Sequence, residues 1–66
     1  MNTLLLQSGF TYDPYCGSYF REDSKGNVHT YMEVENNQWN YEKYDVNDQL
    51  IVSQLLHSNE QLQFND

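Results

Sequence analysis

The chain has 66 residues, and we expect residues 1–66 to form a single compact domain with a thin core, because so small a domain buries only about 60% of its unfolded surface. Its 10 acidic residues against 3 basic ones give a formal net charge of −7. This charge repels nucleic acid and anionic membrane surfaces, so we expect the chain to bind neither directly. It favours instead a partner protein with a basic surface, or it serves solubility alone.

The first residues contain a run of three leucines, Leu4 to Leu6, which fits a short buried strand or a helical turn equally well. They lack the basic region and the apolar run of roughly 7 to 15 residues that mark a secretion signal. Cys16 is the only cysteine, so no disulfide can form within the chain. Together these features predict an intracellular, reducing location.

Residues 12–17 and 23–27 are rich in turn-forming residues, and the alternating stretch between them, Ser18 to Glu22, predicts a short strand. Residues 28–35 form the clearest strand, because apolar and other side chains alternate strictly. The pair Asn36-Asn37 then predicts a two-residue hairpin turn, after which residues 38–45 should return antiparallel.

This register sorts the side chains of the hairpin onto two faces. It places Val34 opposite Trp39 and Met32 opposite Tyr41 on an apolar face that we expect to form the core. The opposite face then carries tyrosines, carboxylates and amides at regular intervals: Tyr31, Glu33, Glu35, Gln38, Asn40, Glu42 and Tyr44.

After Asp45 the apolar residues recur at helical spacing, at Ile51, Val52, Leu55, Leu56 and Leu62. This period predicts a helix from about residue 47 to 61, capped by Asp45 or Asn47. The competing interpretation is a fourth strand from Leu50 to Leu55 after a turn at residues 45–49, which β-branched Ile51 and Val52 favour.

The expected fold is therefore α+β: a small antiparallel three- to four-stranded β-sheet, arranged as a meander, with one C-terminal helix packed on one face. Each part alone would leave its apolar side in water. Packing the helix on the apolar sheet face removes both surfaces from solvent.

Residues 19–28 and 41–50 are weakly similar to each other, since each segment runs from an aromatic residue through charged residues to a polar turn and an aliphatic residue. The pattern resembles the tyrosine-aspartate hairpin repeats of large surface proteins. Repeat arrays need about three units to bury a continuous core, so we interpret the two copies as ordinary hairpin turns.

No residue pattern indicates catalysis, and we expect neither an enzyme nor a bound cofactor or metal. Cys16 would need His29 or His57 beside it to become a nucleophile, and no motif surrounds it. One cysteine and two distant histidines do not make a zinc site, and neither Asp-rich turn continues as a calcium-binding loop. Glu33 and Glu35 point the same way in a regular strand, yet so small a sheet offers no enclosed site for paired carboxylates.

The acidic, tyrosine-bearing face is the remaining candidate site. Tyrosine gives a large contact area for little loss of entropy. Regularly spaced carboxylates resemble the charges of a phosphate backbone, so a basic groove on a partner would attract them. We therefore predict that the partner-binding residues are Tyr31, Glu33, Glu35, Asn40, Glu42 and Tyr44. The alternative is a solvated sheet face whose tyrosines only pair across strands.

In size, charge and the carboxylates of this face, the chain resembles small acidic inhibitors that bacteriophages and mobile elements encode, such as anti-CRISPR proteins and phage inhibitors of uracil-DNA glycosylase. The resemblance implies a non-enzymatic protein in the cytoplasm of a bacterial host, one that occludes a basic nucleic-acid-binding surface of a host protein. The alternative is a small structural or assembly protein, a homodimer or a subunit of a virion or complex, that uses the same face for self-association.

Overall fold

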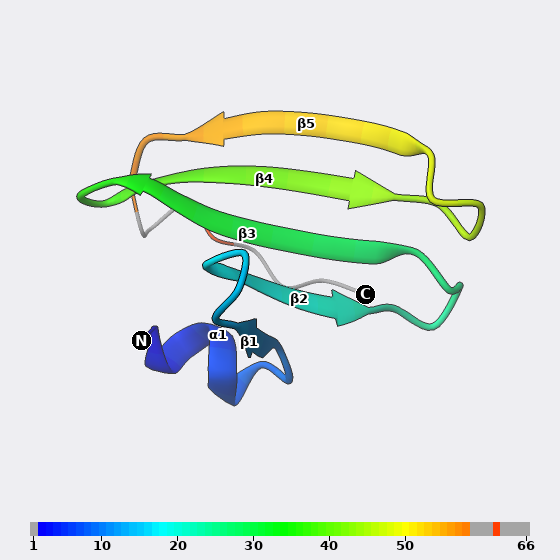
Figure 1. The fold of residues 1–66 in the computed structure, drawn as a ribbon, viewed down its shortest axis with the longest axis horizontal. Coiled ribbons are helices and arrows are strands. Elements are labelled where there is room, and N and C mark those ends of the chain that lie inside the picture. Colours follow the sequence, from blue (N-terminus) through cyan, green and yellow to red (C-terminus); the bar gives the residue numbers. More distant parts are fainter. Residues whose placement is uncertain (1, 59–61, 63–66) are drawn as a thin grey trace.

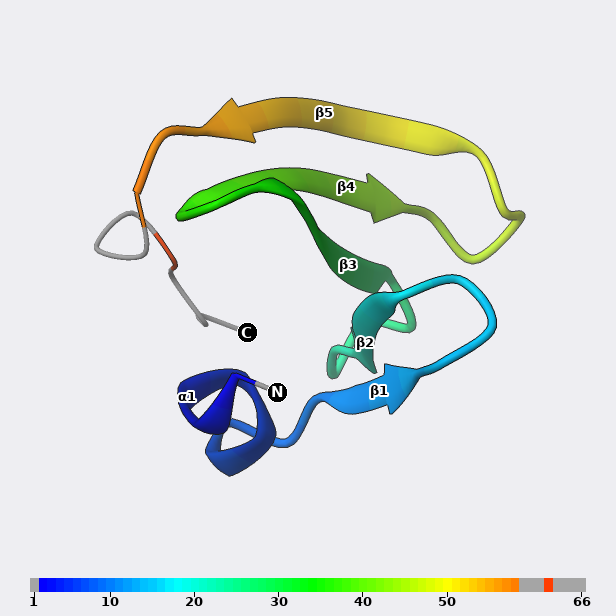
Figure 2. The same ribbon diagram turned by 60° about the vertical axis from the view of Figure 1, so that its left-hand side comes forward.

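The computed structural model describes residues 2–58 and residue 62. Five consecutive strands form one antiparallel sheet in the order of the sequence, and one short helix precedes them (Figure 1). The elements are α1 (Thr3–Gln7), β1 (Thr11–Asp13), β2 (Ser18–Glu22), β3 (Val28–Glu35), β4 (Gln38–Tyr44) and β5 (Leu50–Leu56). The sheet is strongly curved, with β5 at one edge, β1 at the other, and α1 at the open side of the curve (Figure 2).

The antiparallel meander is confirmed, but the sheet has five strands rather than three or four, and the expected C-terminal helix is wrong. Residues 50–56 form strand β5, as in the competing interpretation of the sequence. The end of the expected helix, at residues 59–61, lies outside the described residues. The protein is therefore mostly β.

The turn before β5 explains why strand pairing prevails over helical spacing. The Asp45 carboxylate does not cap a helix; its Oδ1 accepts hydrogen bonds from the backbone N–H groups of Asn47 (2.8 Å) and Gln49 (3.0 Å). The backbone N–H of Asp45 also donates to the carbonyl of Gln49 at 2.9 Å, which closes a hairpin loop. Leu50, Ile51 and Val52 follow this loop, and β-branched residues such as Ile and Val favour an extended strand. The loop reverses the chain, so this segment pairs antiparallel with β4.

The same loop geometry occurs between β2 and β3. The Oδ1 of Asp23 accepts from the N–H groups of Lys25 (2.9 Å) and Asn27 (3.0 Å), and the N–H of Asp23 donates to the carbonyl of Asn27 at 2.8 Å. Both loops place one residue at positive φ, Gly26 (86°) in the first and Asp48 (62°) in the second. A type I turn followed by a left-handed residue is typical of three-residue hairpin loops. The two similar sequence segments are thus two hairpins with equivalent loops.

The run of leucines is helical and short. The Asn2 side chain caps α1 by accepting a hydrogen bond from the N–H of Leu5 at 3.0 Å. Leu5 is fully buried, while Leu4 and Leu6 are exposed. One side of α1 therefore contributes to the core.

The register between β3 and β4 differs from the expected one. The two-residue turn is confirmed, because Glu35 pairs with Gln38 and Asn37 has a φ of 64°. A β-bulge between Glu33 and Glu35 then inserts Val34 as an extra residue, so Glu33 lies opposite Trp39. Beyond the bulge each β3 side chain has moved to the face opposite the expected one.

The core consequently contains Tyr31 in place of Met32 and Val34. Tyr31 is 4% exposed, whereas Met32 is 38% and Val34 is 46% exposed. The expectation for Trp39 is confirmed, and Tyr41 is partly buried against the core. The buried residues come from α1 and its following loop, from four strand positions and from the C-terminal part: Leu5, Phe10, Tyr19, Tyr31, Trp39, Leu56 and Leu62.

Candidate functional site

The strand register assigns each strand residue to one of two faces of the sheet. The inner face contains the core positions, and its cross-strand rows are Tyr12–Tyr19–Tyr31–Tyr41–Gln54, Arg21–His29–Lys43–Val52 and Glu33–Trp39–Leu56. The outer face contains Thr11 and Asp13 of β1, the pair Glu35–Gln38, and the rows Ser18–Met32–Asn40–Leu55, Phe20–Thr30–Glu42–Ser53 and Glu22–Val28–Tyr44–Leu50.

Charge is divided unequally between these faces. Both strand cations, Arg21 and Lys43, lie on the inner face, and Lys25 lies in the loop between β2 and β3. One strand carboxylate, Glu33, is also on the inner face. The other strand carboxylates all lie on the outer face: Asp13, Glu22, Glu35 and Glu42. The outer face is therefore acidic without a strand cation to neutralise it.

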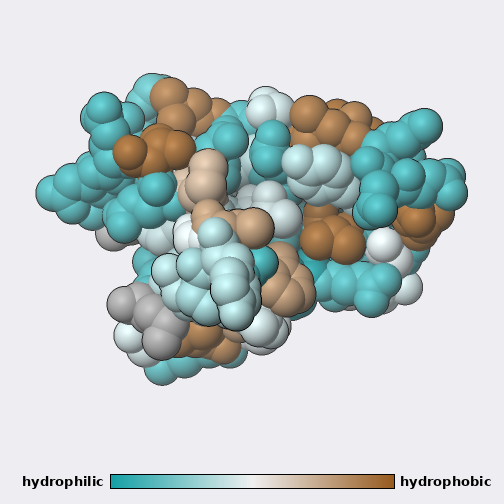
Figure 3. Space-filling view, viewed as in Figure 1, coloured by the Kyte–Doolittle hydropathy of each residue, from teal (hydrophilic) through white to brown (hydrophobic). Residues whose placement is uncertain are grey.

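The outer face also carries large apolar side chains that remain partly in water. Phe20 is 40% exposed and Leu55 is 47% exposed, and Met32 lies between them in the sheet. In Figure 3 hydrophobic residues form patches along the upper border of the molecule, where β5 lies in the same view, and hydrophilic residues surround them. Exposed apolar patches with a polar surround are typical of interaction surfaces.

The structure divides the six residues that the sequence indicated as partner-binding. Glu35, Asn40, Glu42 and Tyr44 share the outer face. Glu42 and Tyr44 also contact each other, since the Tyr44 hydroxyl donates to Oε1 of Glu42 at 3.0 Å, and this bond raises the pKa of Tyr44.

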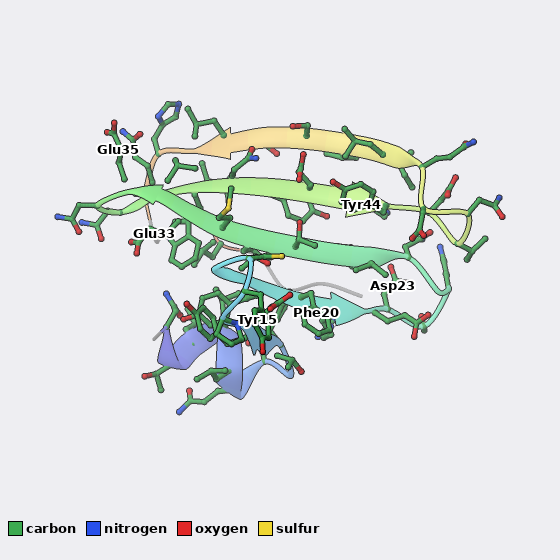
Figure 4. The ribbon with its side chains drawn as sticks, in the orientation of Figure 1. Tyr15, Phe20, Asp23, Glu33, Glu35 and Tyr44 are labelled. Atoms are coloured by element: carbon green, nitrogen blue, oxygen red, sulfur yellow. The ribbon has the colours of Figure 1, made fainter. Side chains whose placement is uncertain are left out.

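The two remaining residues lie on the inner side of the sheet. Tyr31 is buried there, with its ring centroid 5.4 Å from that of Phe10 and 4.9 Å from that of Tyr41. Glu33 is exposed near the hairpin turn and accepts from the N–H of Asn37. Figure 4 shows Glu33 and Glu35 directed to opposite sides of the end of β3. The bulge at Val34 causes this separation.

The sequence reasoning missed the apolar part of the outer face. Phe20 and Met32 occupy this face because Tyr19 and Tyr31, their neighbours in sequence, take the core positions. The alternation of Ser18 to Glu22 contains a signal, since Phe20 and Tyr19 must point to opposite faces, but it does not say which aromatic residue is buried.

A polar network on the inner side connects strands β3 and β4 with the loop between β2 and β3. His29 Nε2 lies 2.8 Å from Oδ2 of Asp23, and His29 Nδ1 lies 2.7 Å from the Tyr41 hydroxyl. A carboxylate only accepts hydrogen bonds, so Nε2 carries a proton, and in the neutral imidazole Nδ1 accepts from Tyr41. The Asp23 side chain is 4% exposed and the His29 side chain 12%.

The network has the composition of an acid–base relay, but its electrostatics favour a structural role. The hydrogen bond from His29, together with the bonds from Asn27 and Lys25, lowers the pKa of Asp23 to about 2 against the effect of burial. Burial, with the charge of Asp23, raises the pKa of Tyr41. The tyrosinate form of Tyr41 is thus disfavoured, which opposes a nucleophilic role.

Cys16 lies in the turn between β1 and β2 and is exposed. A hydrogen bond with Asp13 and the negative charge of this residue raise the pKa of its thiol, so the reactive thiolate is disfavoured. Both ring nitrogens of His29 are engaged with Asp23 and Tyr41. His29 therefore does not serve as a base for Cys16. Tyr15, beside Cys16, is 98% exposed and projects from the same turn (Figure 4).

Within residues 2–58 and residue 62, no group of three or more His, Cys, Asp and Glu side chains is placed to hold a metal ion. The one helix found in that part of the chain is too short to cross a membrane. Comparison with protein-family models, with curated proteins and with solved structures finds no match. The outer face, with its unneutralised carboxylates and exposed apolar side chains, is the candidate functional site.

Proposed function

We propose that the chain is a non-enzymatic inhibitory binding protein that covers a basic, nucleic-acid-binding surface of a protein in a bacterial host. The observation that supports this proposal is the division of charge, which leaves Asp13, Glu22, Glu35 and Glu42 together on the outer face and the strand cations on the inner one. Carboxylates on a hydrogen-bonded sheet are held at fixed spacing, and a basic groove attracts them as it attracts phosphates.

The binding surface that we propose differs from the one expected from the sequence. It keeps Glu35, Asn40, Glu42 and Tyr44, and it adds Phe20 and Met32 as apolar contacts between the charges. Apolar side chains at the centre of an interface supply affinity, whereas charges at its edge mainly speed association and set specificity. The surface therefore fits a basic partner surface that also contains an apolar patch.

The two glutamates at the end of β3 allow a matched test. Glu35→Lys reverses a charge on the outer face, and Glu33→Lys makes the same change on the inner side, two residues away. The immobilised chain is used to capture proteins from bacterial lysate at low and high salt. Each captured protein is then tested for nucleic-acid binding with and without the soluble chain.

We expect the chain to displace nucleic acid from its captured partner. Glu35→Lys should weaken capture at least tenfold and reduce its dependence on salt, whereas Glu33→Lys should bind within about twofold of the wild type, because long-range attraction depends on which charges face the partner. Equal loss in both variants, or a partner that retains its nucleic acid, contradicts the proposal.

A further inference from the structure

The strand carboxylates of the outer face surround its centre like the corners of a frame. The corners of this acidic frame are Asp13, Glu22, Glu35 and Glu42. Neighbouring strands are about 4.8 Å apart and successive residues of one face about 6.6 Å apart, so adjacent corners are separated by about 12 to 14 Å. The register places four residues inside the frame: Ser18, Phe20, Thr30 and Met32. Phe20 is the aromatic residue among them, and its ring is accessible between the charges.

A second aromatic side chain stands at the border of the acidic frame, in the turn that joins Asp13 to Ser18. Tyr15 in this turn is almost fully exposed. Its backbone N–H donates to Oδ1 of Asp13 at 2.9 Å, and the N–H of Gly17 donates to the Asp13 carbonyl at 2.8 Å. An aspartate side chain that accepts from the residue two positions ahead stabilises a compact turn. The turn therefore holds the backbone of Tyr15 in a fixed position beside the frame.

The outer face is the convex side of the sheet. The sheet curves around α1, and the turn between β1 and β2 projects from the side opposite α1 (Figure 2). The strand cations Arg21 and Lys43 lie on the concave inner side. A convex surface makes its largest contact with a concave one, so a partner that covers the whole acidic frame offers a groove with basic walls.

Grooves for single-stranded nucleic acid fit this combination of rings and charges. In a duplex the bases are stacked inside, so a protein contacts phosphates and the polar edges of the bases. A single strand exposes the faces of its bases beside its phosphates, and proteins bind it in basic grooves whose aromatic side chains stack on those bases. Phe20 and Tyr15 offer ring faces to such side chains, and the acidic frame offers charges to the basic walls.

We infer that the partner is a protein that binds single-stranded nucleic acid, in a basic groove whose aromatic side chains pack on Phe20 and Tyr15 when the chain occupies it. The inference rests on the proposed function, because it specifies the partner of the same surface. It adds Tyr15 to that surface, and it gives Phe20 a ring contact that an aliphatic side chain would not make. A surface that replaces a duplex would use the carboxylates alone.

The test uses the proteins that the immobilised chain captures from bacterial lysate. Each is purified and mixed with one labelled oligonucleotide, either single-stranded or annealed to its complement. We expect the partner to bind the single strand about tenfold or more tighter than the duplex, because its aromatic side chains need exposed bases. The soluble chain should displace the single strand.

Substitutions of Phe20 separate the effect of its ring from that of its apolar area. Phe20→Leu remains apolar but cannot stack, so displacement should require about fivefold or more of the chain, whereas Phe20→Tyr keeps a ring and should act within about twofold of the wild type. Tyr15→Leu and Tyr15→Phe are the corresponding pair at the turn. Both positions are exposed, so the variants should fold, which Trp39 fluorescence verifies.

The outcomes distinguish this inference from the proposed function. A partner that prefers the duplex, and releases it to the chain, supports the proposed function and overturns the inference. Equal displacement by the wild type, Phe20→Leu and Tyr15→Leu also overturns the inference, because the carboxylates alone then account for binding. A captured partner that binds no nucleic acid, or that retains it in the presence of the chain, overturns both.

Discussion

The two faces of the sheet contain similar numbers of large side chains but use them differently. The inner face has a row of four tyrosines across β1 to β4, and neighbouring rings lie 4.9 Å apart at Tyr12–Tyr19 and at Tyr31–Tyr41. The outer face has single apolar residues separated by carboxylates, amides and hydroxyls. The tyrosine row of the inner face is a packed layer across β1 to β4, whereas the outer face is a surface that a partner can bind without unfolding the chain.

Substitution of neighbours in β3 tests this division most strongly. Tyr31→Ala should lower the free energy of unfolding by about 3 to 5 kcal/mol, because it leaves a cavity between Phe10 and Tyr41. Met32→Ala, at a partly exposed position, should cost only about 1 kcal/mol. Urea unfolding followed by Trp39 fluorescence measures both. A larger loss of stability in Met32→Ala than in Tyr31→Ala would contradict the observed register and favour the one without a bulge, in which Met32 is buried.

The two equivalent hairpin loops provide a second test, at the end of the sheet. A Cβ atom at Gly26 would lie 2.9 Å from Cγ1 of Val46, and its φ of 86° is unfavourable for other residues, so Gly26→Ala should destabilise by about 1 to 2 kcal/mol. Asp48 occupies the same position in the second loop, and Asp48→Gly should stabilise by about 0.5 kcal/mol. The midpoint temperature of thermal unfolding should therefore fall in Gly26→Ala and rise in Asp48→Gly.

The double variant Gly26→Ala with Val46→Ala separates the two causes of that loss. Val46→Ala removes the atom that the new Cβ would meet, so the double variant should recover part of the stability. No recovery would show that the left-handed conformation alone accounts for the effect.

Removal of a single hydroxyl group from the inner side should have a smaller effect on stability than the substitutions above. Tyr41→Phe deletes the hydrogen bond to His29 and leaves the ring packing, so we expect a loss of about 1 kcal/mol. Tyr44→Phe is the matched change on the outer face, where the hydroxyl bonds Glu42, and it should have a lesser effect because water replaces the lost partner. Chemical unfolding measures both, and equal losses would remove the distinction between the faces.

The last test varies the pH and concerns Asp23, whose contribution to stability depends on its charge. Its pKa in the folded chain is about 2, below the ordinary value of 3.8. The stabilisation is therefore fully present above about pH 4 and is lost as the pH falls through 2. Unfolding measured across this window should depend less on pH in Asp23→Asn. His29→Gln, which removes the main cause of the shift, should move the loss of stability to higher pH.

Several local features follow from the sequence because short-range chemistry decides them. The loop at Asp23 and the two-residue turn at Asn36-Asn37 form where their residue types favour them, whereas the loop at Asp45 belonged only to the competing interpretation. The strand from residue 28 to 35 was likewise expected, and it is confirmed. In the candidate site, Glu35, Asn40, Glu42 and Tyr44 remain on one face because Glu35 lies between the bulge and the turn, and the other three residues lie on β4, after the turn.

Two features were not predictable from local patterns. Residues 50–56 satisfy helical and extended spacing together, and only pairing with β4 distinguishes the two. The face of Tyr31 depends on Val34, since one bulged residue reverses every side chain that precedes it in β3. The bulge brings a tyrosine, with its larger apolar area, into contact with Phe10 in the loop after α1 and with Tyr41 on β4.

The charge of the chain, the turns at Asp23 and at Asn36-Asn37 and the antiparallel hairpin meander could be predicted, because they depend on residue types and near neighbours. The buried side of each strand and the structure of the last apolar segment could not, because burial is a property of the whole sheet. The extra residue Val34 is tolerated in β3 because the register that it produces packs Tyr31 beside Tyr19, Tyr41 and Phe10.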